Sequence, residues 1–249
     1  MIVVRNSPNN TGVVIIGDQL DYERLYEALH EMVGDEDEHI AFQSARLRVL
    51  GICYDLRHAL MGDREIEFVP NGMDKDTMKR MSVMAPDKNV YLRTHALWPE
   101  ILFVTMALND FARLYAAKKS SKKYDMFLSK ELIWDHSLAM IRGFQAAIAQ
   151  CIKDTVSPST YSRVKNLMMK DYAWFDGYTW QYLDILNCRF IEMDKDKRLK
   201  NIPIMAKRLA ERGDEYLRLR TEVIAAAERY NTSSEGIAVS VDYPDVIEW

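Results

Sequence analysis

Apolar and polar residues alternate in several short runs near the start of the chain. Alternation with a period of two residues is typical of β-strands that bury one face. Such runs lie at residues 2–16, 65–69 and 89–97, and the first is interrupted by a dense turn signal that predicts a hairpin. A further alternating run at residues 236–241 predicts a strand close to the C-terminus.

Most of the remaining chain repeats its apolar residues at the helical spacing of three and four. Helices are predicted at about 21–33, at 44–61 and through most of 98–230. The economical arrangement is a single α+β domain over residues 1–249, in which a mainly helical bundle packs on a small antiparallel sheet. The N-terminal hairpin, the two internal strands and the C-terminal strand are expected to form that sheet.

The predicted helix 44–61 carries an unusual arginine. On a helical wheel at about 100° per residue, its apolar arc holds Val49, Leu50, Ile52, Cys53, Leu56, Leu60 and Met61. Arg57 falls in the middle of that arc. A guanidinium stays protonated in proteins, so its burial demands a carboxylate, a group of carbonyls or a bound anion. The sequence therefore predicts a buried Arg57 whose counter-charge is not identified.

Arginine and histidine occur together twice, as Arg57 with His58 and as Arg93 with His95. Arginine binds phosphate through two hydrogen bonds, and histidine transfers a proton near neutral pH. These four residues are therefore the candidate catalytic set of a phosphate-directed enzyme, such as a ribonuclease-like component of a defence or toxin system. The structural alternative, which we favour, pairs Arg57 with an acid of residues 63–67 and hydrogen-bonds His58 at the helix end.

Two short motifs have the spacing of metal ligands on helices. Glu27 and His30 form an ExxH, and Asp55 and His58 form a DxxH on the next helix. Facing helices with such pairs would resemble a carboxylate-bridged metal site in a helical bundle. Glu27 and His30, however, share the polar face of their helix, where they should face water. We therefore predict no metal and no cofactor, and keep these four residues as weak candidates.

Composition narrows the class of protein. Of the 249 residues, 48% are hydrophobic and 28% are charged, and the net charge is −4, which argues against a nucleic-acid partner. Cys53, Cys151 and Cys188 are far apart, so reduced thiols in a cytoplasm are expected. No apolar run is long enough to cross a membrane. The glycine-rich and serine-containing motifs of common nucleotide-binding proteins and hydrolases are missing from the sequence.

Several segments resemble a bacterial protein family of unknown function. They are residues 6–13, Gly17-Asp18, residues 53–65, Trp98-Pro99-Glu100 and residues 108–111. The resemblance covers residues 1–115. It implies a bacterial or phage-related intracellular origin, and it brings no activity and no catalytic residue.

The leading functional hypothesis is a binding or regulatory protein of a bacterial cytoplasm. Its partner would be another protein or a second copy of the chain, bound through the C-terminal helices. The phosphate-directed enzyme is the first alternative, and a metal-dependent enzyme on a helical bundle is the second. The sequence leaves open whether the protein is an enzyme.

Overall fold

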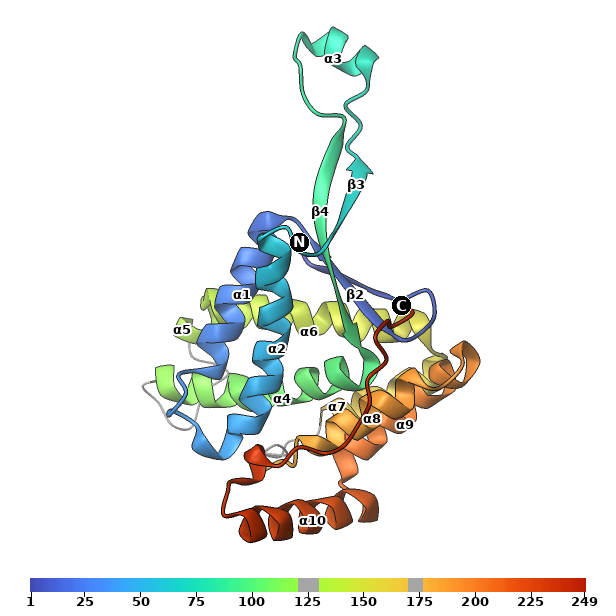
Figure 1. The fold of residues 1–249 in the computed structure, drawn as a ribbon. Helices are drawn as coiled ribbons and strands as arrows, with labels where there is room; N and C mark the ends of the chain where they lie inside the picture. The colour runs from blue at the N-terminus through green and yellow to red at the C-terminus, as the bar shows by residue number, and fades with distance from the viewer. Residues whose placement is uncertain (121–129, 170–176) are drawn as a thin grey trace.

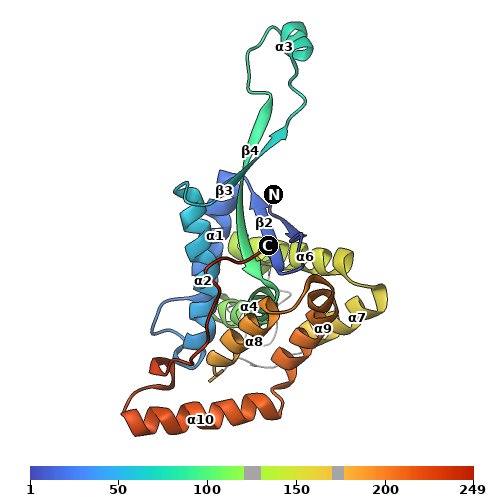
Figure 2. The same ribbon diagram turned by 45° about the vertical axis from the view of Figure 1, so that its right-hand side comes forward.

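Helices surround a small sheet from which one hairpin projects far into solvent (Figures 1 and 2). The computed structural model describes residues 1–120, 130–169 and 177–249. The sheet has four antiparallel strands in the order β1-β2-β4-β3. Their bounds are β1 Val3–Asn6, β2 Gly12–Gly17, β3 Glu65–Pro70 and β4 Lys88–Leu97. The predicted α+β class, the N-terminal hairpin and the two internal strands are confirmed.

The described helices account for most of the chain. Their bounds are α1 Gln19–Val33, α2 Gln43–Leu60, α3 Lys75–Met81, α4 Trp98–Lys119, α5 Lys130–Ile133, α6 His136–Thr155, α7 Pro158–Met168, α8 Gln181–Ile191, α9 Lys195–Glu211 and α10 Asp214–Tyr230. Short 3-10 turns lie at Ile40–Phe42 and Ser234–Gly236. Among the helices in the described ranges, none has the length and apolar character needed to span a bilayer.

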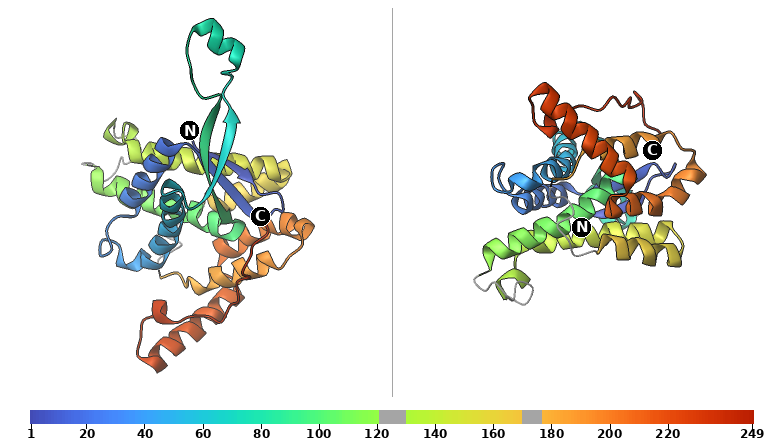
Figure 3. Two further views of the ribbon diagram at one scale, coloured as in Figure 1. Left: turned by 45° about the horizontal axis from the view of Figure 1, so that its top comes forward. Right: turned by 90° about the horizontal axis from the view of Figure 1, so that it is seen from below.

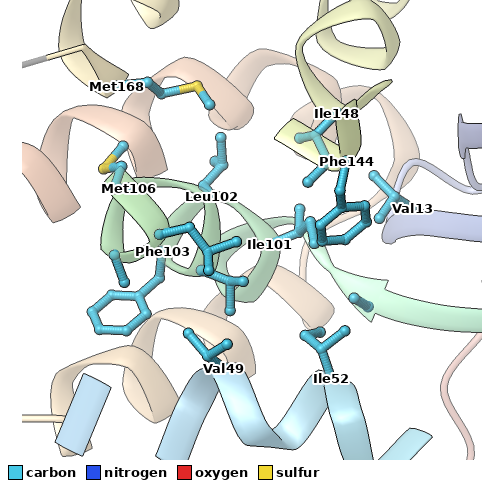
Figure 4. Packing of buried hydrophobic residues seen from close by; sticks show 14 of the residues in the cluster. Val13, Val49, Ile52, Ile101, Leu102, Phe103, Met106, Phe144, Ile148 and Met168 are labelled. Atoms are coloured by element: carbon cyan, nitrogen blue, oxygen red, sulfur yellow. The ribbon is translucent and has the colours of Figure 1, made fainter. Parts of the chain in front are cut away.

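Helix α4 forms the centre of the core. It is apolar nearly all round, as expected for a helix with neighbours on every side, and it contacts α1, α2, α6, α7, α8 and α9. In Figure 4, Val49 and Ile52 of α2 reach α4 from one side, and Phe144 and Ile148 of α6 reach it from the other. Pro99 lies in the first turn of α4, where the backbone N–H groups have no acceptor within the helix. The missing N–H of proline therefore costs no hydrogen bond there.

The N-terminus of α1 is fixed by a capping box. Asp18 occupies the N-cap position, and its side chain accepts a hydrogen bond from the Asp21 backbone. The Asp21 carboxylate in turn accepts from the backbone N–H of Asp18. Each carboxylate therefore accepts a hydrogen bond from the backbone N–H of the other residue, which would otherwise have no partner at the start of the helix.

All six residues of β2 are buried, so both faces of the sheet's centre are covered. Val13 and Ile15 face the helical core. Val14 lies beside His95 in the register and points to the opposite face. There the last residue of the chain, Trp249, stacks on the His95 ring with 4.8 Å between ring centroids.

The predicted C-terminal strand at 236–241 is wrong. Residues 237–249 form no strand but run as an extended tail across the molecule (Figure 1). Hydrogen bonds from side chains, and not backbone pairing with a strand, hold the tail in place. Gln181 Nε2 donates to the carbonyls of Ser234 and Ile237 at 2.7 and 2.6 Å. The far end of the tail is held where the Thr11 hydroxyl donates to the Glu248 carbonyl.

The last part of the helical region predicted up to residue 230 forms two helices, α9 and α10. The chain breaks at Arg212, whose φ of 45° lies in the left-handed region and ends α9. Pro203 lies inside α9, which begins earlier than expected because Asp194 caps it. Helix α10 then turns away to the end of the molecule opposite the projecting hairpin (Figures 1 and 3).

Gly12 allows the closest approach between β2 and β4. A Cβ atom at this position would lie 2.0 Å from the Ala96 carbonyl oxygen, which is backbone and cannot move aside. We therefore expect Gly12→Ala to lower the free energy of unfolding by about 2 kcal/mol or more. As the matched control, Gly51→Ala in α2 has open space around its Cβ and should raise it by about 0.5–1 kcal/mol. Urea denaturation of both variants checks this, and equal effects would contradict it.

Candidate functional site: the projecting arm and the cavity at its base

The hairpin of β3 and β4, with α3 between them, extends away from the body of the molecule (Figure 2). We call residues 65–92 the arm. Its strands pair from Glu65 beside Arg93 to Pro70 beside Lys88. At the tip, the backbone of Asn71 donates to the Asp87 carbonyl at 3.1 Å, and Asp74 caps α3. The arm therefore has defined local structure without support from the body.

One face of the arm is apolar and uncovered. Ile66 lies beside Leu92, and Phe68 lies beside Val90, so the four side chains form one strip, which we call the arm face. Ile66, Phe68 and Val90 are 49%, 57% and 49% exposed. Leu92 is half-buried and packs against the core, so the arm face continues the core face of the sheet into solvent. An exposed apolar strip of this kind is typical of a binding surface.

The opposite face of the arm carries paired charges. Arg93 lies 3.5 Å from a carboxylate oxygen of Glu65 and 3.8 Å from one of Glu67. These two acids come from β3, and Arg93 comes from β4, so the ion pairs join the strands at the arm's base. The charged pairs thus lie on the face opposite the arm face, which they share with Val69 and Tyr91.

At the base of the arm lies a cavity of about 290 Å³ with both apolar and polar walls, which we call the basal cavity. Its walls come from α2, β4, α4, α8 and the C-terminal tail, and its polar lining consists of Arg48, Asp55, His95, Glu100, Asn187 and Tyr243. Because the tail supplies Tyr243 and Trp249, the cavity exists only when the end of the chain lies against the sheet.

Arg48 connects three helices beside this cavity. Its guanidinium lies 2.7 Å from Asp184 and 3.4 Å from Glu100, and it also donates to the Trp180 carbonyl at 3.3 Å. The guanidinium carbon lies 4.9 Å from the centre of the Trp180 ring, within cation–π distance. Asn187 donates to the same Glu100 oxygen at 2.8 Å. Arg48, whose side chain is 17% exposed, therefore has the kind of carboxylate counter-charge that the sequence predicts for Arg57.

Charge and burial oppose each other in this group. Burial works to lower the pKa of Arg48, but the Glu100 and Asp184 carboxylates raise it above its ordinary value. Burial raises the pKa of Glu100 despite Arg48 and Asn187, which act to lower it. The cation is thus held firmly, while the Glu100 carboxyl takes up a proton more readily than an exposed glutamic acid.

Arg57 is exposed, so the prediction that it is buried is wrong. It stands nine residues after Arg48 in α2, which at about 100° per residue places it on the opposite side of the helix. The predicted arc included Leu50 and Met61, and these two shifted its centre toward Arg57. Met61 is in fact 61% exposed, and the buried side of α2 is centred on Ile52 and Leu56 instead.

The four predicted catalytic residues do not line one cavity. His95 lines the basal cavity, whereas Arg57 lies on the solvent side of α2. His58 Nδ1 lies 3.3 Å from Asp63 just beyond the end of α2, as expected for a histidine hydrogen-bonded at the helix end, but Arg57 forms no ion pair with the acids of residues 63–67. Arg93 is held by acids of β3. Whether any of them is catalytic stays a prediction.

The candidate metal ligands also lie apart. Glu27 is exposed, and His30 packs its ring against Tyr26 with 4.5 Å between centroids. Asp55 accepts from Arg64 at 2.8 Å, away from His58. Within the described ranges, no group of three or more histidine, cysteine or acidic side chains is arranged to hold a metal ion.

Sequence reasoning missed Arg48, Asp184 and the arm face. A helical wheel centred on Val49, Ile52 and Leu56 alone, without Leu50 and Met61, would have placed Arg48 on the buried side of α2. Phe68 lies in a strand that the sequence predicts, but an alternating pattern does not show whether anything covers the apolar face.

The contrast between Arg48 and Arg57 gives a direct test. Arg48→Met leaves Glu100 and Asp184 without their cation, and we expect it to lower the free energy of unfolding by about 3 kcal/mol. Arg57→Met removes an exposed charge and should change it by less than about 0.5 kcal/mol. Chemical denaturation measures both values. Similar losses for the two variants would contradict the assigned roles.

His95 predicts a pH dependence of stability. Burial lowers its pKa, with Arg93 acting in the same direction and Glu65 and Asp55 against it. The unfolded chain therefore binds this proton more readily, so the folded state loses stability as the pH falls below about 6.5. His95→Phe keeps a ring against Trp249 and removes this titration.

The loss of unfolding free energy between about pH 7.5 and about pH 5.5 should consequently be smaller in His95→Phe than in the unchanged protein. Urea denaturation at both pH values measures it. Burial and Arg46 also lower the pKa of His30, but that residue contributes equally to both proteins. An equal loss of unfolding free energy in the variant and in the unchanged protein would show that folding does not lower the pKa of His95.

Comparison with known proteins gives one match. A family model described as a domain of unknown function, DUF6904, matches residues 2–249. No curated protein and no solved structure matches the chain. The match confirms the resemblance to a family of unknown function and extends it from residues 1–115 to nearly the whole sequence. The chain belongs to the DUF6904 family.

Proposed function

We propose that the protein is a binding protein that assembles through its arm. The observation that carries this proposal is the arm face, where Ile66, Phe68 and Val90 remain exposed although they continue the apolar core. A two-stranded hairpin is only marginally stable by itself in water. A partner that covers the arm face would bury this strip and stabilise the hairpin.

The partner we propose is a second copy of the chain. The arm carries five acidic and four basic residues, so its charges nearly cancel. A twofold contact places the same surface on both sides of the interface. Two strongly charged arms would repel each other, whereas two arms that each carry acidic and basic residues in nearly equal number would not. Two arm faces in contact would pack as two sheets do, with apolar side chains between them.

The cellular setting is part of the proposal. Cys53, Cys151 and Cys188 are buried free thiols, which supports a reducing cytoplasm. The sequence resemblance supports a bacterial or phage-related source. Neither the phosphate-directed enzyme nor the metal-dependent enzyme has an observation among the described residues that favours it over binding, and both stay predictions.

Phe68 provides the test. Light scattering coupled to size-exclusion chromatography should find the unchanged protein at twice the mass of one chain. Phe68→Glu places a charge in the arm face and should weaken self-association by about tenfold or more. Asn89→Glu is the matched control, because Asn89 is an exposed neighbour whose side chain points to the opposite face of the arm. This variant should remain dimeric.

Two results would overturn the proposal. A monomeric unchanged protein at tens of micromolar would exclude the second copy as partner. A dimer that survives Phe68→Glu would place the contact elsewhere, with the C-terminal helices as the next surface to test. Circular dichroism of each variant confirms that the body remains folded, which is expected because Phe68 is mostly exposed.

A further inference from the structure

A second cavity lies on the far side of α4 from α2, between α4, α6 and α7. We call it the α4–α6–α7 groove. It has a volume of about 230 Å³. Its walls are mainly apolar and include Ala146, Ala149, Ile152 and Met168. Ligand sites usually measure roughly 300–1,000 Å³, so this groove suits only a small molecule.

A cation is fixed at one side of the groove by uncharged partners. Arg142 Nη1 donates to the side-chain oxygens of Asn109 and Gln145 at 2.9 and 2.8 Å. Those amides are themselves fixed, because Gln145 donates to the Thr105 carbonyl at 2.9 Å and Asn109 donates to the Met168 carbonyl at 2.8 Å. Gln145 is buried and Asn109 is partly buried, whereas Arg142 is exposed, so these amides orient the guanidinium at the surface of the groove before any ligand arrives.

The remaining donors of Arg142 have no acceptor among the described residues. Its hydrogen bonds use only Nη1, which leaves the edge formed by Nε and Nη2 unused. No carboxylate of the described ranges forms an ion pair with Arg142. That edge of a guanidinium matches the two oxygens of a carboxylate, which it binds through two parallel hydrogen bonds.

The electrostatics of the groove also favour an anion. Lys165 of α7 lines it as well, and within the described chain this lysine has no ion pair either. Burial lowers the pKa of Arg142, and the nearby positive charge of Arg113 acts in the same direction. Among the described residues that line the groove, none is an aspartate or a glutamate. A bound anion would offset the positive charges of Arg142 and Lys165.

We infer that the α4–α6–α7 groove binds a small organic carboxylate with an apolar body. The carboxylate would contact the free edge of Arg142 and the ammonium of Lys165. The apolar body would lie against the methionine, isoleucine and alanine side chains. This site does not depend on the arm, because the two surfaces share no residue, so its failure and that of the proposed dimer are separate outcomes.

Isothermal titration with octanoate tests the inference on the full chain. We expect a dissociation constant of about 10–100 µM, since a ligand of this size gains a fraction of a kcal/mol per atom. Octanol has the same apolar body without the charge, and acetate has the charge without the body. Both should bind at least about tenfold more weakly than octanoate. Inorganic phosphate distinguishes a general anion site from a carboxylate site.

Arg142→Gln should weaken octanoate binding by about tenfold or more, because it removes the charged donors and keeps an amide in the network. Arg163→Gln is the matched control, since Arg163 is an exposed arginine on α7 outside the groove. It should leave binding unchanged. Thermal melting shows that both variants fold.

Equal affinity for octanol and octanoate would overturn the inference, as would unchanged binding by Arg142→Gln. Binding of phosphate as tight as that of octanoate would overturn the assignment to a carboxylate. The absence of detectable heat at millimolar octanoate, together with no rise in melting temperature, would show that the groove is not a site for this class of ligand.

Discussion

The ion pairs of Arg48 fix how the helices of this protein sit relative to one another. A guanidinium from α2 meets carboxylates from α4 and α8, and the Trp180 ring lies over it. Hydrogen bonds to a planar guanidinium are directional, so only a narrow range of helix positions satisfies all three groups. Apolar packing alone would tolerate small sliding of these helices. The charged group therefore contributes to the uniqueness of the arrangement as well as to its stability.

Asp184, one of the two acids paired with Arg48, also links the body of the protein to the C-terminal tail. Tyr243 donates to Asp184 at 3.1 Å, and Trp249 stacks on His95, so the tail depends on residues of α8 and β4. The sheet would otherwise have one open face, because β2 buries Val14 and Ile16 on the side away from the helices. A tail without regular structure thus takes the place that a further layer of helices occupies in larger α+β proteins.

The projecting arm follows from a difference in strand length. β4 has ten residues, whereas its neighbour β2 has six, so the outer part of β4 pairs only with β3. The apolar alternation that serves the core near Ala96 continues outward to Val90, where no helix of the described chain lies beneath it. The arm face and the α4–α6–α7 groove therefore arise in different ways: the arm face comes from a strand longer than its neighbour, and the groove lies between three helices beside Arg142, which forms no ion pair with the described residues.

The sequence by itself determined most of the elements, because periodicity is a local property. The N-terminal hairpin, the two internal strands, the helical character of residues 98–119 and the need of a buried arginine for a counter-charge could all be predicted. Tertiary structure decided which arginine of α2 was shielded from water, since Met61 is apolar yet 61% exposed and Leu50 is only partly buried at the edge of the core. It also decided that the C-terminal run became a tail and that Phe68 stayed exposed. Burial depends on residues distant in the chain, and no local pattern records them.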